Sequence, residues 1–205
     1  MSPINSFLAL GDSYTIGEGV APGERWPVQL AARLRGEGID IADPQIVATT
    51  GWTTDELSLA VATAEFTPPY ALVTLLIGVN NQYRGRSVDE YRLQFRALLQ
   101  RATELAGAHA TRVIVVSIPD WGGTPFAARD GRDAARIAGE IDAFNAAASA
   151  EAAKAGAAWV DVTTISRQPE APDELVGDGL HPSGTQYARW VDALLPVARM
   201  ILAGD

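Results

Sequence analysis

The stretch LVTLLIGVNN, residues Leu72–Asn81, joins an almost uninterrupted apolar run to a glycine and two asparagines. Strands that are buried on both faces read as continuous apolar runs, and such strands are typical of parallel sheets. Gly78 follows the run directly, so Asn80 and Asn81 come just after the carboxyl end of the predicted strand. In an open parallel sheet, the loops at that end build the ligand site. The stretch therefore predicts a central strand with polar side chains at the functional edge.

Apolar runs recur on both sides of this stretch, separated by segments in which apolar residues have helical spacing. This alternation is typical of a parallel sheet that is covered by helices on both faces. The predicted strands are residues 7–10, 46–49, 71–77, 112–118 and 158–162. The 205 residues, 47% of them hydrophobic, suffice for one buried core. Since no linker or repeat divides them, we expect a single domain over residues 1–205.

Capping pairs mark three of the predicted helix starts, because a serine or threonine is followed three residues later by glutamate or glutamine. The pairs are Thr53 with Glu56, Ser87 with Glu90 and Ser183 with Gln186. Helices are predicted over residues 27–35, after Ser87, within residues 129–155 and from Ser183 onward, where Pro196 is expected to kink or split the last one. The longest predicted loops are residues 17–25, 119–128 and 168–182.

The composition excludes several classes of function. A net charge of −9 and a pI near 4.7 disfavour contact with a phosphate backbone, so we expect no nucleic-acid partner. The chain has no cysteine, which excludes disulfides and thiolate chemistry, and two histidines cannot build a histidine-rich metal site. No segment approaches the ~20 apolar residues of a membrane helix, and residues 1–5 lack the basic stretch of a signal peptide. We expect a cytoplasmic protein without stable membrane insertion.

Nucleophilic acyl transfer needs a hydroxyl, a base, an acid that orients the base, and donors for the developing oxyanion. The triplet Gly11-Asp12-Ser13 follows the first predicted strand, where the glycine permits a sharp turn and Ser13 is presented at the carboxyl end of the strand. Taken alone, the triplet also fits a turn with a helix-capping serine. It therefore identifies Ser13 as a candidate nucleophile only in combination with the other groups.

Asp178 and His181 stand three residues apart in one loop, just before the last predicted helix. A single turn can bring this carboxylate to Nδ1 of the imidazole, which leaves Nε2 free to accept a proton. Asp12, Asp120 and Asp161 also lie near strand ends and are alternative partners of the histidine. The spacing favours Asp178.

Two further residues at strand ends can donate hydrogen bonds to an oxyanion. Gly51 offers a backbone N–H with no side chain to obstruct a substrate, the Asn80 amide offers a second donor, and the N–H of Ser13 offers a third. Read singly, Gly51 is equally a turn glycine and Asn80 a strand-end asparagine. His109 precedes the fourth predicted strand, at the other end of the sheet, and is expected on the surface.

Together these four blocks resemble, in identity and in order, the SGNH (GDSL) hydrolase family of lipases and esterases. The resemblance spans residues 11–181. It implies a flavodoxin-like, three-layer α/β/α sandwich with a five-stranded parallel sheet, and neither a metal nor an organic cofactor. The site it implies has a catalytic triad of Ser13, Asp178 and His181 and an oxyanion hole of Ser13, Gly51 and Asn80.

Two residues depart from the family pattern. Tyr14 stands where the older family name expects leucine, and Asn81 stands where aspartate is frequent, so any ordering role of the usual acid is in doubt. The aromatic residues Trp52, Trp121 and Phe126 fall in or beside the predicted site loops and either line a substrate pocket or pack within the loops.

These observations predict a serine hydrolase of small-molecule carboxylic esters that acts through an acyl-enzyme. Because the predicted loops are short and include no lid, short acyl groups such as acetyl are the expected substrates. A lysophospholipase, a thioesterase and a carbohydrate deacetylase are alternatives within the family. An alternative of another class is a non-catalytic flavodoxin-like module that binds phosphate at residues 11–19.

Overall fold

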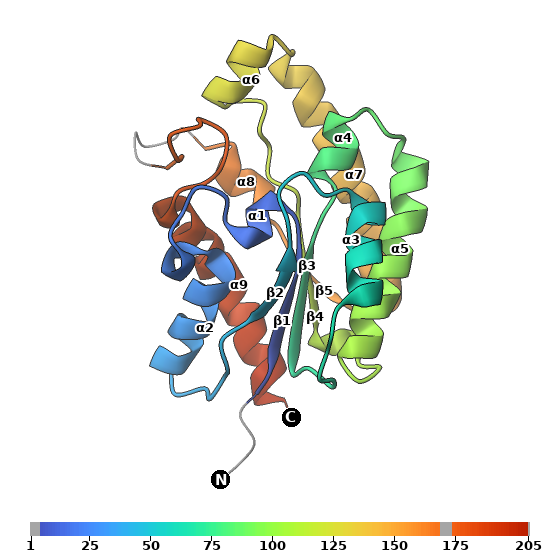
Figure 1. Cartoon of the computed structure of the whole chain (residues 1–205), viewed down its shortest axis with the longest axis vertical. Coiled ribbons are helices and arrows are strands. Elements are labelled where there is room, and N and C mark those ends of the chain that lie inside the picture. Colours follow the sequence, from blue (N-terminus) through green and yellow to red (C-terminus); the bar gives the residue numbers. More distant parts are fainter. Residues whose placement is uncertain (1–4, 169–173, 205) are drawn as a thin grey trace.

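The computed structural model describes residues 5–168 and 174–204 and contains a five-stranded, all-parallel sheet in the order β2-β1-β3-β4-β5 (Figure 1). Helices flank both faces, so the predicted α/β fold with a five-stranded parallel sheet is confirmed. The apolar runs of the sequence supply the strands, with small differences at their ends. The strands are β1 (Phe7–Gly11), β2 (Gln45–Ala48), β3 (Leu72–Leu76), β4 (Val113–Val116) and β5 (Ala158–Val160).

The long helices form two layers around the sheet (Figure 1). On one face α2 (Trp26–Gly36) packs against α9 (Gly184–Ala203), and on the other α5 (Val88–Leu105) packs against α7 (Ala134–Ala155) and α3 (Thr54–Thr63). Every residue of β1, β3 and β4 is buried, which explains why these strands are almost entirely apolar, with Thr74 as the polar exception. In the part of the chain that the structure describes, no helix is long and apolar enough to cross a membrane.

The predicted capping pairs begin α3, α5 and α9. The Thr53 backbone N–H donates to Glu56 (2.8 Å), Ser87 Oγ accepts from the N–H of Glu90 (3.2 Å), and Ser183 caps the last helix in the same way. These bonds satisfy N–H groups that have no partner within the helix.

Of the two outcomes predicted at Pro196, a kink or a split, the split is wrong, because α9 continues through the proline as one helix. Proline removes one donor, which leaves the carbonyl four residues earlier, on Asp192, without its usual partner. Both residues are exposed, so water can replace the lost hydrogen bond. The buried residues Leu194 and Ala198 hold the two halves of the helix against the same core.

Short elements occupy the edge of the sheet at the carboxyl ends of the strands. The predicted loop 119–128 contains the start of a helix, loop 17–25 contains a 3₁₀ turn, and loop 168–182 lies partly outside the described residues. A helix of one turn is too short for hydrophobic periodicity to reveal it. These short elements are α1 (Ser13–Ile16), α4 (Val79–Tyr83), α6 (Pro125–Asp130), α8 (Thr163–Ser166) and the 3₁₀ turn η1 (Pro22–Glu24). A second 3₁₀ turn, η2 (Ala110–Arg112), lies at the opposite edge, directly before β4.

Candidate active site

Ser13 is the first residue of α1, directly beyond the carboxyl end of β1. The Asp12 side chain caps this helix by accepting a hydrogen bond from the Tyr14 N–H (3.1 Å). Gly11 permits the close approach of β1 to its neighbour, because a Cβ atom there would lie 2.5 Å from the carbonyl oxygen of Leu76. Ser13 is only 4% exposed, and the part that is accessible lines a pocket.

Asp178 and His181 form one compact turn. Asp178 Oδ1 accepts hydrogen bonds from the backbone N–H groups of Leu180 (2.7 Å) and His181 (3.0 Å), while Oδ2 lies 2.6 Å from Nδ1 of the imidazole. An ionised carboxylate can only accept, so Nδ1 carries the proton in this contact and Nε2 of a neutral ring is left as the acceptor. The contact between Asp178 and His181 that the spacing favoured is therefore present.

The charge state of Asp178 follows from the same contacts. Partial burial alone would raise the pKa of the Asp178 carboxyl, but hydrogen bonds from the His181 ring and from the backbone of His181 and Leu180 outweigh it and hold the pKa below its usual value. Asp178 is thus ionised at neutral pH and matches the imidazole N–H as a charged acceptor.

Helix α6 supports this turn from outside, which the sequence did not indicate. The backbone N–H of Phe126 donates to the carbonyl of Gly179 (3.0 Å), and Arg129 Nη2 donates to the carbonyl of Asp178 (2.6 Å). On the other side, the Tyr14 ring lies 5.6 Å from the imidazole between ring centroids. Tyr14, which departs from the family pattern, therefore packs against His181.

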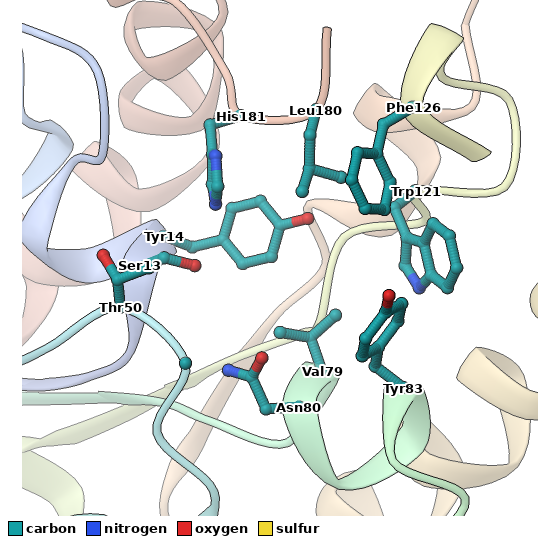
Figure 2. Close-up of a pocket in the computed structure, with 11 residues that line it drawn as sticks. Ser13, Tyr14, Thr50, Val79, Asn80, Tyr83, Trp121, Phe126, Leu180 and His181 are labelled. Atoms are coloured by element: carbon teal, nitrogen blue, oxygen red, sulfur yellow. The ribbon is translucent and has the colours of Figure 1, made fainter. Parts of the chain in front are cut away.

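Asn80 lies on the side of the pocket opposite His181 (Figure 2), and Gly51, the other predicted donor from a strand end, also lines the pocket. Gly51 has a φ of +87°, in the left-handed region that glycine favours, and a Cβ atom there would meet nothing closer than 3.9 Å. The Asn80 side-chain amide donates to the carbonyl of Trp52 (2.9 Å). Glycine is thus required at residue 51 for its backbone conformation rather than for space.

Asn81 has a clear ordering role, which removes the doubt raised by the missing aspartate. Its side chain is fully buried, accepts from the Thr54 N–H (3.1 Å) and donates to Thr54 Oγ1 (2.7 Å). An asparagine can make both bonds at once, whereas an ionised aspartate can only accept. Asn81 therefore fixes α4, which carries Asn80, to the start of α3.

One pocket of about 180 Å³ joins the predicted groups (Figure 2). Ser13, His181 and Asn80 lie toward one end of it, and aromatic rings form the other end. Trp121 and Phe126 belong to this aromatic wall, as one reading of the sequence suggested, but the described lining does not include Trp52. The lining residues are Ser13, Tyr14, Thr50, Gly51, Val79, Asn80, Tyr83, Trp121, Phe126, Leu180 and His181.

The aromatic wall is held from behind by polar contacts. Trp121 Nε1 donates to Gln82 Oε1 (2.9 Å), and Gln82 in turn donates to Glu140 (2.7 Å). The guanidinium carbon of Arg132 lies 4.1 Å above the centre of the Tyr83 ring, within the range of a cation–π contact. These contacts fix the ring planes that face the pocket.

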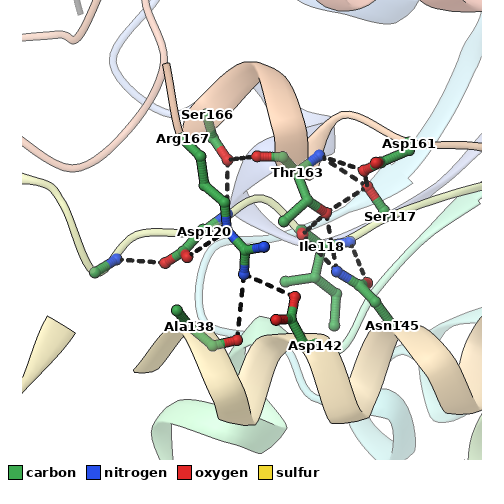
Figure 3. Close-up of polar contacts among 11 residues, drawn as sticks. Ser117, Ile118, Asp120, Ala138, Asp142, Asn145, Asp161, Thr163, Ser166 and Arg167 are labelled. Carbon is green, nitrogen blue, oxygen red and sulfur yellow. Dashed lines mark hydrogen bonds and ion pairs between the residues drawn. The ribbon is translucent and has the colours of Figure 1, made fainter. Parts of the chain in front are cut away.

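The three alternative aspartates are engaged elsewhere. Asp161 accepts from Ser117 Oγ (3.1 Å), and Asp120 accepts from Arg167 (2.8 Å) in a network at the ends of β4 and β5 (Figure 3). Asp12 is fully buried, and burial raises its pKa to about 7 despite backbone hydrogen bonds that lower it. Of the four candidates, Asp178 is the one that bonds the imidazole. His109 is exposed, as expected.

Solved structures share this fold over almost the whole chain. The crystal structure of TesA has a TM-score of 0.73 at 22% identity and covers 96% of this chain and 99% of its own. The psychrotrophic esterase EstA from Pseudoalteromonas sp., inhibited by monoethylphosphonate, has a TM-score of 0.70 at 18% identity (97% and 99% covered). A W190I mutant of Axe2, an acetyl-xylooligosaccharide esterase from Geobacillus Stearmophilus, has a TM-score of 0.70 at 18% identity (95% and 94% covered).

At these identities, the similarity establishes the fold. A comparison with curated proteins found no match. The sequence model of the GDSL-like lipase/acylhydrolase family, in contrast, matches residues 9–189, which include every proposed site residue. The chain therefore belongs to the GDSL-like lipase/acylhydrolase family.

Proposed function

We propose that the protein hydrolyses carboxylic esters of short acyl groups through an acyl-enzyme on Ser13. One observation carries the proposal: Ser13, Gly51, Asn80 and His181 come from four separate parts of the chain and line one pocket, with Asp178 bonded to the imidazole. These groups are the hydroxyl, base, orienting acid and donors that acyl transfer requires.

The reaction has two steps. Ser13 Oγ attacks the ester carbonyl carbon while His181 Nε2 takes the hydroxyl proton, and the carbonyl oxygen becomes an oxyanion near the N–H groups of Ser13, Gly51 and Asn80. Collapse breaks the bond to the alcohol, which leaves with the proton from His181. Water then attacks the acyl-enzyme, gives its proton to the same nitrogen, and the acid departs when Ser13 Oγ regains that proton.

The size of the pocket supports a short acyl group. A volume of about 180 Å³ is below the roughly 300 Å³ at which drug-sized ligand sites begin. Phe126, Trp121 and Tyr83 form the end away from Ser13 and limit the length of a chain that binds there (Figure 2). The similar esterase Axe2 acts on acetylated sugars, so acetyl esters belong in the test.

The test is a series of p-nitrophenyl esters from acetate to octanoate together with acetylated sugars. We expect kcat/KM to be highest for the shortest chains, and Phe126→Ala to shift the preference toward longer ones. Phe66, which packs on Tyr70 outside the pocket lining, provides the control variant Phe66→Ala. A preference for octanoate in the unaltered protein contradicts the short-acyl proposal.

Labelling tests the nucleophile separately. A fluorophosphonate should modify Ser13 in the unaltered protein, as a phosphonate inhibits the similar esterase EstA, and should not label Ser13→Ala. Equal labelling of both proteins excludes Ser13 as the nucleophile.

A further inference from the structure

Gly51 lies in a tight turn whose type determines the direction of its N–H. The Trp52 N–H donates to the Thr49 carbonyl (3.3 Å), so Thr50 and Gly51 are the central residues of a four-residue turn. Gly51 has a φ of +87°, while Thr50 is absent from the described residues with positive φ. A positive φ at the third position alone defines a type II turn.

The two common turn types differ in the central peptide. In a type I turn both central residues have negative φ, and the peptide between them is rotated by about half a turn relative to type II. Here that peptide consists of the Thr50 carbonyl and the Gly51 N–H. Rotation would therefore replace the N–H that is proposed to face the oxyanion with a carbonyl oxygen, which repels an oxyanion instead of stabilising it.

Glycine does not itself prevent this rotation, because it adopts positive and negative φ with similar ease. Contacts from outside the turn are then needed to keep the peptide in place. Among the described residues, the Gly51 N–H donates to no other group, so no bond of its own holds it.

Two charged side chains hold the residues on either side of this peptide. The Thr50 hydroxyl donates to the carboxylate of Glu18, from the loop after α1. Arg84 Nη2, from the end of α4, donates to the Gly51 carbonyl at 2.6 Å. The Arg84 guanidinium also lies 3.4 Å from Glu56, which keeps it beside the turn.

We propose that Arg84 and Glu18 are positioning residues that anchor both ends of the Thr50–Gly51 peptide and so keep its N–H in place beside the oxyanion. This inference rests on the proposed function, since it assumes that an oxyanion forms at Ser13. Hydrogen bonds to charged groups are stronger than those between neutral groups, so these two fix both flanks of the peptide, the Thr50 side chain and the Gly51 carbonyl, beside the pocket. Neither residue is among those that line the pocket, so each acts through the turn.

The test compares Arg84→Ala with Arg86→Ala. Arg86 follows closely in the chain and pairs with Asp55 (2.5 Å), away from the pocket lining, so its variant controls for loss of a surface charge. We expect Arg84→Ala to lower kcat on p-nitrophenyl acetate about tenfold, with KM and Tm little changed. Arg86→Ala should keep kcat within twofold of the unaltered protein.

Rescue separates positioning from a general structural role. Guanidinium ion, at concentrations far below those that unfold proteins, should restore part of kcat in Arg84→Ala and leave Arg86→Ala unchanged. Glu18→Gln keeps an acceptor for the Thr50 hydroxyl and should retain more activity than Glu18→Ala. Unchanged kcat in Arg84→Ala, or a loss that guanidinium does not relieve, overturns the inference.

Ser13→Ala, measured in parallel, distinguishes this failure from failure of the proposed function. If Ser13→Ala is inactive and Arg84→Ala is fully active, only the positioning role is wrong. If Ser13→Ala keeps full activity, no oxyanion forms on Ser13, and both proposals are wrong.

Discussion

The side-chain amide of Asn80 donates a hydrogen bond of 2.9 Å to the backbone carbonyl of Trp52. Because a carbonyl oxygen can only accept, this contact requires the NH₂ group rather than the amide oxygen on that side. One N–H is engaged with Trp52, and the other is available to a ligand in the pocket that Asn80 lines. The contact thus orients Asn80 as a donor before any substrate binds.

Asn80→Ala should therefore lower kcat by roughly 10² to 10³, the loss typical of one oxyanion donor, with little change in KM. Asn80→Asp should be no better, since an ionised carboxylate cannot donate and faces both the Trp52 carbonyl and the developing oxyanion. Measuring kcat for both variants on a p-nitrophenyl ester checks this. Near-normal turnover of Asn80→Asp would remove Asn80 from the oxyanion hole.

The neighbouring Asn81 provides the contrasting control. Asn81→Ala leaves the Thr54 N–H without its partner in a fully buried place, which typically costs about 1–3 kcal/mol of the free energy of unfolding. Its Tm should fall clearly, whereas Asn80→Ala should melt close to the unaltered protein. A larger loss of Tm in Asn80→Ala would reverse the roles assigned to the two residues.

Replacing the proposed nucleophile or base should abolish nearly all activity, because such residues act as a unit. Ser13→Ala and His181→Ala are therefore both expected to be inactive on the p-nitrophenyl esters, with Tm measured to confirm folding. His109→Ala removes the other histidine, which is exposed at the opposite edge of the sheet, and should keep normal turnover. A fully active His181→Ala variant would rule out the proposed mechanism.

Local patterns in the sequence predicted most of what positions the site. The almost uninterrupted apolar run before Gly78 identified β3, because a strand that is buried on both faces is mostly apolar. The pairing of Asp178 with His181 was predictable because three residues of one turn determine it. Both inferences depend on spacing within a short segment, which a sequence displays directly.

Contacts between distant segments were not predictable in this way. Arg129 reaches the carbonyl of Asp178, and Arg84 reaches that of Gly51, across gaps of 49 and 33 residues. A donor to a backbone carbonyl leaves no pattern, since every residue offers the same acceptor. Helix α6 was missed because it has only six residues, and because Gly122, Gly123 and Pro125, which precede or begin it, are typical of a loop.

The buried Asp12 should make stability depend on pH. Burial raises its pKa to about 7 from an ordinary value of 3.8, and its Oδ2 atom has no hydrogen-bond partner among the described residues. Between about pH 4 and 7 the folded protein holds a proton that the unfolded chain releases. The free energy of unfolding contributed by Asp12 is therefore greatest below pH 4 and falls as the pH rises, by up to about 1.4 kcal/mol per unit.

Asp12→Asn has no such proton and should lack this slope. Urea unfolding of both proteins at several pH values between 4.5 and 7.5 gives the comparison, and the difference in slope is independent of any constant change in stability. The depressed pKa values of Glu151 and Asp178 act in the opposite direction, but at more acidic pH. Parallel curves for the two proteins would show that Asp12 is ionised in the fold.

The arrangement around Asp178 predicts that Asp178→Asn is at least as damaging as Asp178→Ala. Asp178 Oδ1 accepts two backbone N–H groups and Oδ2 accepts the ring N–H. An asparagine that keeps its oxygen on the backbone amides must present its NH₂ group to Nδ1 of His181. The ring must then accept at Nδ1 and carry its proton on Nε2, where it cannot take a proton from Ser13. The same substitution in a serine-protease triad lowers kcat by about 10⁴.

Asp178→Ala, in contrast, removes the orienting acid without imposing the wrong tautomer. A fraction of the molecules therefore keeps the His181 tautomer in which Nε2 carries no proton. We expect its kcat to exceed that of Asp178→Asn, although the alanine variant also loses both bonds that close the turn and should have the lower Tm. Asp178→Asn should thus have the lower kcat of the two variants, and Asp178→Ala the lower Tm. If Asp178→Asn were instead nearly as active as the unaltered protein, the carboxylate would not set the tautomer of His181, and the role assigned to Asp178 would be wrong.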